Sequence, residues 1–171
     1  RPAATHPDDA VYDAIADILS TGRDSRMYRS MVRDQKIALA SGAFNGYPGT
    51  KYPHLMLFWG MTSPGHTNEE IQAAITEEIQ KITSEPVTDD ELQKVKTRAK
   101  ANLLRGLTSN SGIAMQLAIY NAQTGDWREL FRSVDKIEKV TQEDIMRVAK
   151  STFVPTNRTV AMIVKEEEAS N

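Results

Sequence analysis

Residues 22–44 read GRDSRMYRSMVRDQKIALASGAF, a stretch that changes character halfway along. The first half is basic and places Met27, Met31 and Val32 on the inner side of one helix. The second half, residues 37–44, carries no charge and reads as a strand. The stretch therefore predicts a short helix that leads, almost without a loop, into a buried strand.

Working outward from this stretch, the sequence predicts a second strand and a preceding helix. The turn-forming residues NGYPGT at 45–50 separate the first strand from a second one at residues 54–62. Before the stretch, apolar residues recur at i, i+3, i+4, i+7 and i+8, the pattern of one helix face. These residues are Val11, Ala14, Ile15, Ile18 and Leu19.

Mostly helices follow the second strand. Thr67 with Glu70, and Thr88 with Glu91, have the spacing of capping boxes, in which a threonine and a glutamate satisfy free amides at a helix start. Each box opens a helix with a regular apolar stripe. Three further helices are predicted at residues 111–123, 127–137 and 141–153, and a last strand at residues 158–165.

This order of elements predicts an α+β fold, with an antiparallel sheet covered on one face by several helices. Three strands make a thin sheet for so many amphipathic helices, so we expect that the first strand or strands of the domain are missing. Residues 1–171 read as a single domain and, because the chain begins at Arg1, as a fragment of a longer chain.

Composition excludes several classes of function. The formal net charge of -2 argues against a nucleic-acid partner, which would require a basic surface. No apolar run approaches the roughly 20 residues of a membrane helix, so we expect no membrane insertion. The chain has 0 cysteines, which excludes disulfides and thiolate metal sites.

The residues offer no recognisable active site. The 3 histidines show neither the zinc-protease pattern H-E-x-x-H nor its inverted form H-x-x-E-H. A G-x-S-x-G nucleophile turn and a glycine-rich phosphate loop are also absent. Read by itself, the sequence predicts no catalytic residue, no metal ligand and no cofactor in this chain, and a lone His54 reads as structural rather than as a ligand.

Six segments, in this order along the chain, resemble the pitrilysin/insulinase family of zinc metallopeptidases. The first is HPDDAVYDAIADILSTGRDSRMYRSMVRDQKIALASGAF, at residues 6–44. The others are PGHTNEEIQAAITEEIQKI, VTDDELQKVKTRAKANLL, LTSNSGIAMQLA, TGDW and VTQEDIMRVAKSTFVPTNRTVAMIV. The resemblance covers nearly the whole chain.

The resemblance implies a role in proteolysis without chemistry in this chain. Family members pair homologous α+β domains into halves that close over peptide substrates, and only the catalytic half carries zinc. This chain is similar to the non-catalytic, C-terminal-type domain, so we expect it to help enclose a peptide substrate and to assemble with a zinc-bearing half on the same or a separate chain. It is not expected to be an enzyme on its own, and the resemblance favours the bacterial periplasm.

Two other interpretations remain open. The chain could be a purely structural or assembly subunit of a larger complex derived from the same family. It could also be a zinc enzyme with an unrecognised site. An H-x-x-E-H motif upstream in the same reading frame, or in a neighbouring one, would favour the peptidase over the structural subunit.

The resemblance also suggests which residues contact substrate. Active relatives place an arginine and, seven residues later, a tyrosine to assist the zinc site across the chamber, and these positions correspond to Val32 and Leu39, neither of which donates a hydrogen bond. The substrate-binding candidates are Arg26, Arg105 and Asn110.

Each of these candidates also has a structural interpretation. Arg26 is equally placed to pair with a nearby acid, Arg105 to face solvent, and Asn110 to lie in a helix break and cap. Among Met56, Phe58 and Trp59, some side chains must be core, because the two faces of a strand alternate.

Overall fold

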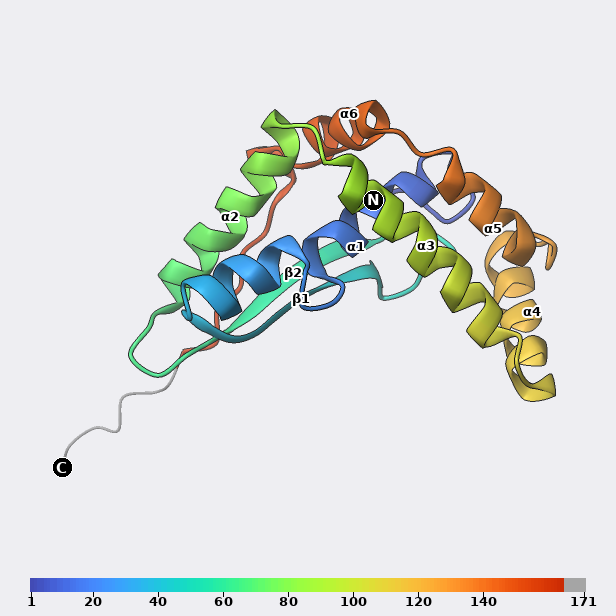
Figure 1. Cartoon of the computed structure of the whole chain (residues 1–171), viewed down its shortest axis with the longest axis horizontal. Coiled ribbons are helices and arrows are strands. Elements are labelled where there is room, and N and C mark those ends of the chain that lie inside the picture. The colour runs from blue at the N-terminus through green and yellow to red at the C-terminus, as the bar shows by residue number, and fades with distance from the viewer. Residues whose placement is uncertain (165–171) are drawn as a thin grey trace.

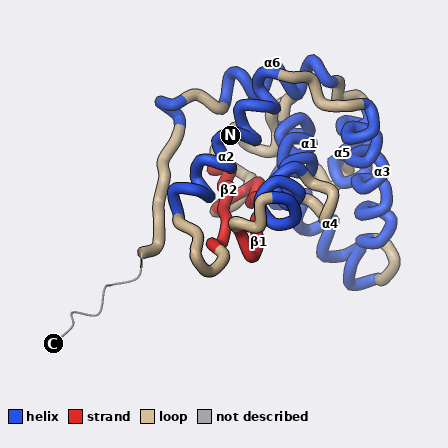
Figure 2. Tube along the Cα trace, turned by 60° about the vertical axis from the view of Figure 1, so that its left-hand side comes forward, coloured by secondary structure: helices blue, strands red, loops and turns tan. Residues whose placement is uncertain are grey.

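The structure is a computed structural model that describes residues 1–164 (Figure 1). In chain order, the elements are α1 (Asp9–Ser20), the π-helix η1 (Tyr28–Asp34), β1 (Ala38–Tyr47), β2 (Leu55–Thr62), α2 (Asn68–Ser84), α3 (Asp89–Gly106), α4 (Asn110–Thr124), α5 (Glu129–Glu138), α6 (Gln142–Thr152) and the 3-10 turn η2 (Pro155–Asn157). Figure 2 shows the two strands in red, with helices above them and to the left and right in that view. The predicted α+β fold, an antiparallel sheet with helices on one face, is confirmed.

The sheet is a single antiparallel hairpin of β1 and β2. Cross-strand partners include Ala43 with Phe58 and Gly42 with Trp59. Because side chains alternate across a strand, these two pairs point to opposite faces. Phe58 turns inward and meets the Phe153 ring edge-on at 5.7 Å between ring centres, which identifies the inner face as the one covered by helices.

The core forms where α1 lies against the inner face of the hairpin. The predicted helix face of α1 is buried, with Ala14, Ile15 and Leu19 each 0% exposed. Helices α3, α5 and α6 also contact α1. The apolar stripes of the helices converge on this one cluster, which includes Met31 from η1 and Ile82 from α2.

Both predicted capping boxes are present. Thr67 and Glu70 satisfy each other's backbone amides at the start of α2, and Thr88 and Glu91 do the same for α3. A third box at the start of α6, in which Asp144 replaces glutamate, follows the same spacing and was missed in the sequence.

The helix predicted within residues 22–44 is a π-helix rather than an α-helix over Tyr28–Asp34. Its backbone bonds span five residues, as in the bond that the Gln35 amide donates to the Ser30 carbonyl at 3.0 Å. A wider turn changes which side chains share a face. Even so, Met27 and Met31 are buried and Val32 packs against the core, so the inner face predicted for this segment is confirmed.

The last strand, predicted at residues 158–165, is wrong over residues 158–164, which form no sheet ladder. A strand needs a backbone partner, and β2 pairs with β1 alone. This segment is extended but is held along α2 by side chains: Arg158 donates to Thr76 at 3.4 Å, and Asn68 donates to the Ile163 carbonyl at 3.0 Å (Figure 1). Lys165, the last residue of the predicted strand, lies outside the described residues.

An ion pair fastens the turn before η1 to the start of α3. The Arg26 guanidinium donates two hydrogen bonds to the Glu91 carboxylate, at 2.7 and 2.9 Å. Burial of Glu91 acts to raise its pKa, but the hydrogen bonds from Arg26 and Thr88 outweigh burial and lower the pKa to about 2. The carboxylate is therefore ionised at neutral pH.

Ile82→Ala should lower the free energy of unfolding by about 2–5 kcal/mol, because the side chain is fully buried. Ile75 lies on the same helix but is only partly buried against the core, so Ile75→Ala should cost about 1–2 kcal/mol. Urea denaturation of the two variants measures both values. Equal losses at the two positions would contradict the burial described above.

Glu91→Gln should destabilise the protein by about 1–2 kcal/mol at pH 7, a value discounted for partial solvent exposure of the ion pair. Glutamine can still complete the capping box, so the loss isolates the ion pair. The folded pKa lies below the unfolded value of 4.5, so the stabilisation is present above pH 4.5 and is lost as the pH falls toward 2.

Urea midpoints of wild type and Glu91→Gln should therefore converge between pH 4.5 and pH 2. Asp90→Asn is the control, because Asp90 pairs with Lys94 in an exposed position and its loss should change stability by less than about 0.5 kcal/mol. A difference for Glu91→Gln that is unchanged at low pH would rule out the ion pair as its source.

Candidate functional site

The outer face of the hairpin, opposite α1, is the most distinctive surface of the described chain. Its side chains are apolar and are not covered by a helix. Leu39 is 59% exposed, Phe44 60% and Met61 56%. We call this surface the outer strip and define it by seven residues: Leu39, Ala40, Gly42, Phe44, Leu57, Trp59 and Met61.

Two aromatic rings lie at the middle of the outer strip. Phe44 and Trp59 stack at 6.4 Å between ring centres, with 24° between their planes. The indole of Trp59 lies across Gly42, its cross-strand partner, where a β-carbon would be 2.9 Å from Cζ2 of the indole. Glycine at this position is what allows the ring to lie flat on the sheet.

The hairpin carries no acidic residue. Between residues 35 and 63, the charged side chains are Lys36, just before β1, and Lys51, in the loop between the strands. Lys51 lies over the Tyr52 ring, 5.9 Å from its centre. In a chain with a net charge of -2, this segment is locally neutral to basic.

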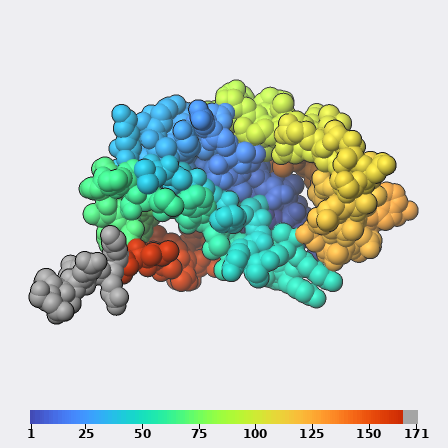
Figure 3. All heavy atoms as spheres, turned by 90° about the horizontal axis from the view of Figure 1, so that it is seen from below, coloured from blue at the N-terminus to red at the C-terminus, as the bar shows by residue number. Residues whose placement is uncertain are grey.

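Helix α4 borders the same side of the molecule. Its fifteen residues, Asn110–Thr124, include no charged side chain and no buried residue, and Met115 is 63% exposed. Seen from below, the cyan hairpin and the yellow α4 lie on either side of a hollow (Figure 3). A cavity of about 310 Å³ is lined by residues of α1, α3, α4 and α5.

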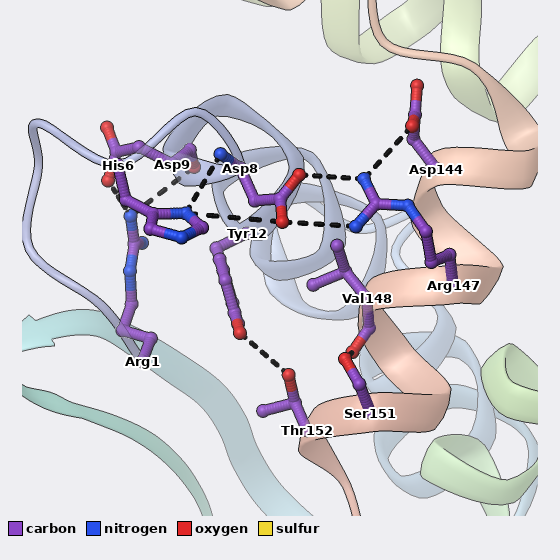
Figure 4. A network of polar contacts seen from close by, with 10 residues as sticks. All are labelled: Arg1, His6, Asp8, Asp9, Tyr12, Asp144, Arg147, Val148, Ser151 and Thr152. Atoms are coloured by element: carbon purple, nitrogen blue, oxygen red, sulfur yellow. Dashed lines mark hydrogen bonds and ion pairs between the residues drawn. The ribbon is translucent and has the colours of Figure 1, made fainter.

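A network of polar contacts joins the N-terminal segment to α6 (Figure 4). Arg147 donates to Asp8 at 2.7 Å and to Asp144 at 3.1 Å, and the hydroxyls of Tyr12 and Thr152 lie 2.7 Å apart. The buried guanidinium of Arg1 donates to the carboxylates of Asp9 and Asp13. The network therefore ties elements together rather than presenting groups to a ligand.

Two titratable groups beside this network are perturbed by burial. Burial, with the neighbouring charge of Asp13, raises the pKa of Asp9 to about 6, although Arg1 acts in the opposite direction. Burial lowers the pKa of His54, whose Nδ1 lies 2.9 Å from the Tyr52 carbonyl oxygen. The His54 ring is 6% exposed and contacts its own loop, in keeping with the structural role predicted for it.

No metal-ligand cluster is found within residues 1–164, where no three histidine, aspartate or glutamate side chains gather in a way that could hold an ion. The same residues include no helix with the length and apolar character needed to cross a membrane.

The structure does not bring the three predicted substrate-binding residues together. Arg26, in the turn before η1, is bonded to Glu91 at the start of α3. Arg105 lies in the last turn of α3 and donates to Asn102. Glu91 and Arg105 are about 21 Å apart along the helix, at ~1.5 Å per residue. Asn110 begins α4 beyond that end and is exposed. A role in substrate binding stays a prediction for all three.

The two positions assigned to the family's assisting residues point in different directions. Val32 is partly buried and packs against the core, whereas Leu39 is exposed on the outer strip. Arg33 is exposed and bonded to Asp34 at 2.6 Å. Leu39 follows the π-helix and lies in β1, at a register shift between Ala38 and Ala40, so its direction is set by the strand and not by the helix.

Of the three strand residues with two interpretations, Met56 and Phe58 pack against the core, and Trp59 faces outward. Sequence reasoning missed Phe44 and Gly42 as partners of Trp59. A signal was available: pairing the two strands across the NGYPGT turn with strict alternation places large apolar side chains of both strands on the outward face.

Comparison with known proteins places the chain in a family. The family model described as "Peptidase M16 inactive domain" matches residues 2–99, more than half of the chain. A zinc protease of Helicobacter pylori, PqqE, is 28% identical over 162 residues. The match covers 95% of this chain and 36% of that protein, so the chain spans about a third of its relative's length.

Solved structures agree in fold. The inactive peptidase domain of a candidate zinc protease from Bordetella parapertussis superimposes with a TM-score of 0.84 at 24% identity, covering 99% of this chain and 91% of that one. A candidate zinc protease from Bordetella pertussis gives a TM-score of 0.78 at 26% identity, covering 92% and 86%. Because the matched model, the sequence relative and the folds agree, this chain belongs to the peptidase M16 family of metallopeptidases and corresponds to its inactive domain.

Proposed function

We propose that this chain helps enclose a peptide substrate and assembles with a zinc-bearing half, on the same or a separate chain. The observation that carries the proposal is the outer strip, an apolar sheet face that no helix covers. Contiguous exposed apolar surface of this kind marks a binding face in a soluble domain. The relatives named as zinc proteases support a peptidase as the larger protein.

The surroundings of the outer strip support enclosure. The hollow between the hairpin and α4 gives this side of the molecule a concave form (Figure 3). Neither α4 nor the two strands carry a charged side chain, whereas Asp13 and Asp17 of α1 line the cavity beside α4. A concave, largely apolar surface can exclude water from a bound peptide while another half of the protein supplies the chemistry.

The zinc would then belong to the partner half. Hydrolysis of a peptide bond by a zinc enzyme requires a metal-activated water, and residues 1–164 offer no group of ligands to hold the metal. What this chain would contribute is position, because holding a peptide in a reactive geometry lowers the barrier without any new chemical group.

The chain alone should not cleave a fluorogenic peptide above the rate of a sample treated with chelator. Mixed with the zinc-bearing half, which is recognisable by an H-x-x-E-H motif in the same or a neighbouring reading frame, it should raise peptidase activity at least about tenfold through positioning. Steady-state peptide hydrolysis measures both. An unchanged rate in a mixture that forms a stable complex would favour a purely structural subunit instead.

Purified chain, after dialysis, should hold well under one zinc per molecule, because no three histidine, aspartate or glutamate side chains gather to hold an ion within residues 1–164, which include all three histidines. Elemental analysis measures the metal content. One tightly held zinc per chain that disappears in His54→Ala or His66→Ala would show that this chain has a metal site. It would overturn the proposal that the zinc belongs to the partner half.

A further inference from the structure

We propose that Phe44 and Trp59 form a platform that binds an aromatic side chain of an extended peptide, and that the peptide is neutral or acidic. This proposal rests on the proposed function, since it names the class of substrate that the outer strip selects. The geometry, the surrounding charge and the exposure of the two rings each support it.

The first argument is geometric. The indole of Trp59 lies flat over Gly42, and the Phe44 ring continues the surface at a 24° angle. Trp59 remains 38% exposed and Phe44 60% exposed, so each ring presents area to a ligand. Aromatic side chains pack on such surfaces in offset or edge-on arrangements, and the contact contributes beyond the area that it buries.

The second argument is charge. The outer strip has no charged member, and the hairpin around it has no acidic residue. Lys36 and Lys51 lie at opposite ends of β1, which at ten residues spans about 34 Å. An extended peptide with a carboxylate near one end would meet a lysine, whereas lysine and arginine residues in the peptide would be repelled.

The same charges disfavour a second copy of this chain as the occupant. Two hairpins that met face to face would bring their lysines together without a compensating acid on either outer strip. A peptide with the opposite charge does not have this cost. The observations therefore favour a peptide over self-association.

The experiment uses residues 1–171 with Trp127→Phe, so that Trp59 is the single tryptophan. Three ten-residue peptides of alanine and serine serve as probes: one with a central phenylalanine and a glutamate near one end, one with alanine replacing the phenylalanine, and one with lysine replacing the glutamate. Titration calorimetry and Trp59 emission should show the first peptide binding about two- to tenfold more tightly than either of the others, the range of a single aromatic or exposed charge contact.

Two variants test the platform itself by calorimetry. Trp59→Ala should weaken binding of the phenylalanine peptide about two- to tenfold and should leave the alanine peptide unchanged. Gly42→Ala should have a similar effect although Trp59 is retained, because the added methyl group displaces the indole. Circular dichroism and urea midpoints check that each variant folds. If Gly42→Ala does not fold, the Trp59→Ala result alone tests the platform.

The matched control is Trp127→Ala, made in the wild-type chain and measured by calorimetry. Trp127 is 41% exposed and packs edge-on with Phe131 at 6.3 Å on the α5 side, so it is a second exposed aromatic pair away from the hairpin. Its loss should not change the affinity for the phenylalanine peptide.

Three outcomes would overturn the platform: equal binding of the phenylalanine and alanine peptides, no saturable binding of any of the three, or a Trp59→Ala variant that changes the oligomeric state but not peptide affinity. Failure here is distinguishable from failure of the proposed function. The platform can fail while the chain still raises the activity of the zinc-bearing half, and that activity is measured separately.

Discussion

The packing of α1 against the inner face of the hairpin is the interaction on which the rest of the structure depends. An isolated two-stranded hairpin is marginally stable in water, so β1 and β2 need an apolar partner. Ile15 and Leu19 supply it, and burying each side chain contributes about 1.5–3 kcal/mol. Helices α3, α5 and α6 then close around α1, so the same helix organises both the sheet and the bundle.

This arrangement gives the hairpin two different faces. The inner face is fixed by contacts such as that of Phe58 with Phe153, and the outer face is left without a helix. An exposed strip that includes Phe44 and Trp59 has a cost in solubility, which an ordinary surface avoids through polar side chains. A binding role for this face explains its apolar character, whereas the fold alone does not require it.

Charged residues in this chain hold elements together instead of performing chemistry. Arg26 reaches Glu91 across 65 positions of sequence, and Arg98 reaches Asp17 across 81, so that α3 is fastened both to α1 and to the turn before η1. Arg147 does the same between α6 and the start of α1. These arginines and carboxylates are therefore paired within the fold.

The sequence by itself determined the elements whose signals are local. Apolar periodicity located α1, and the threonine boxes located the starts of α2 and α3, because each signal involves residues within about one or two helical turns. Only the tertiary structure decided what depends on distant partners. Residues 158–164 have strand-like composition but no backbone partner, and the helix over Tyr28–Asp34 is a π-helix rather than an α-helix. Hairpin pairing with alternating side chains puts Phe44 and Trp59 on one face of the sheet, but that this face points outward depends on the position of α1, which is set by contacts across the chain.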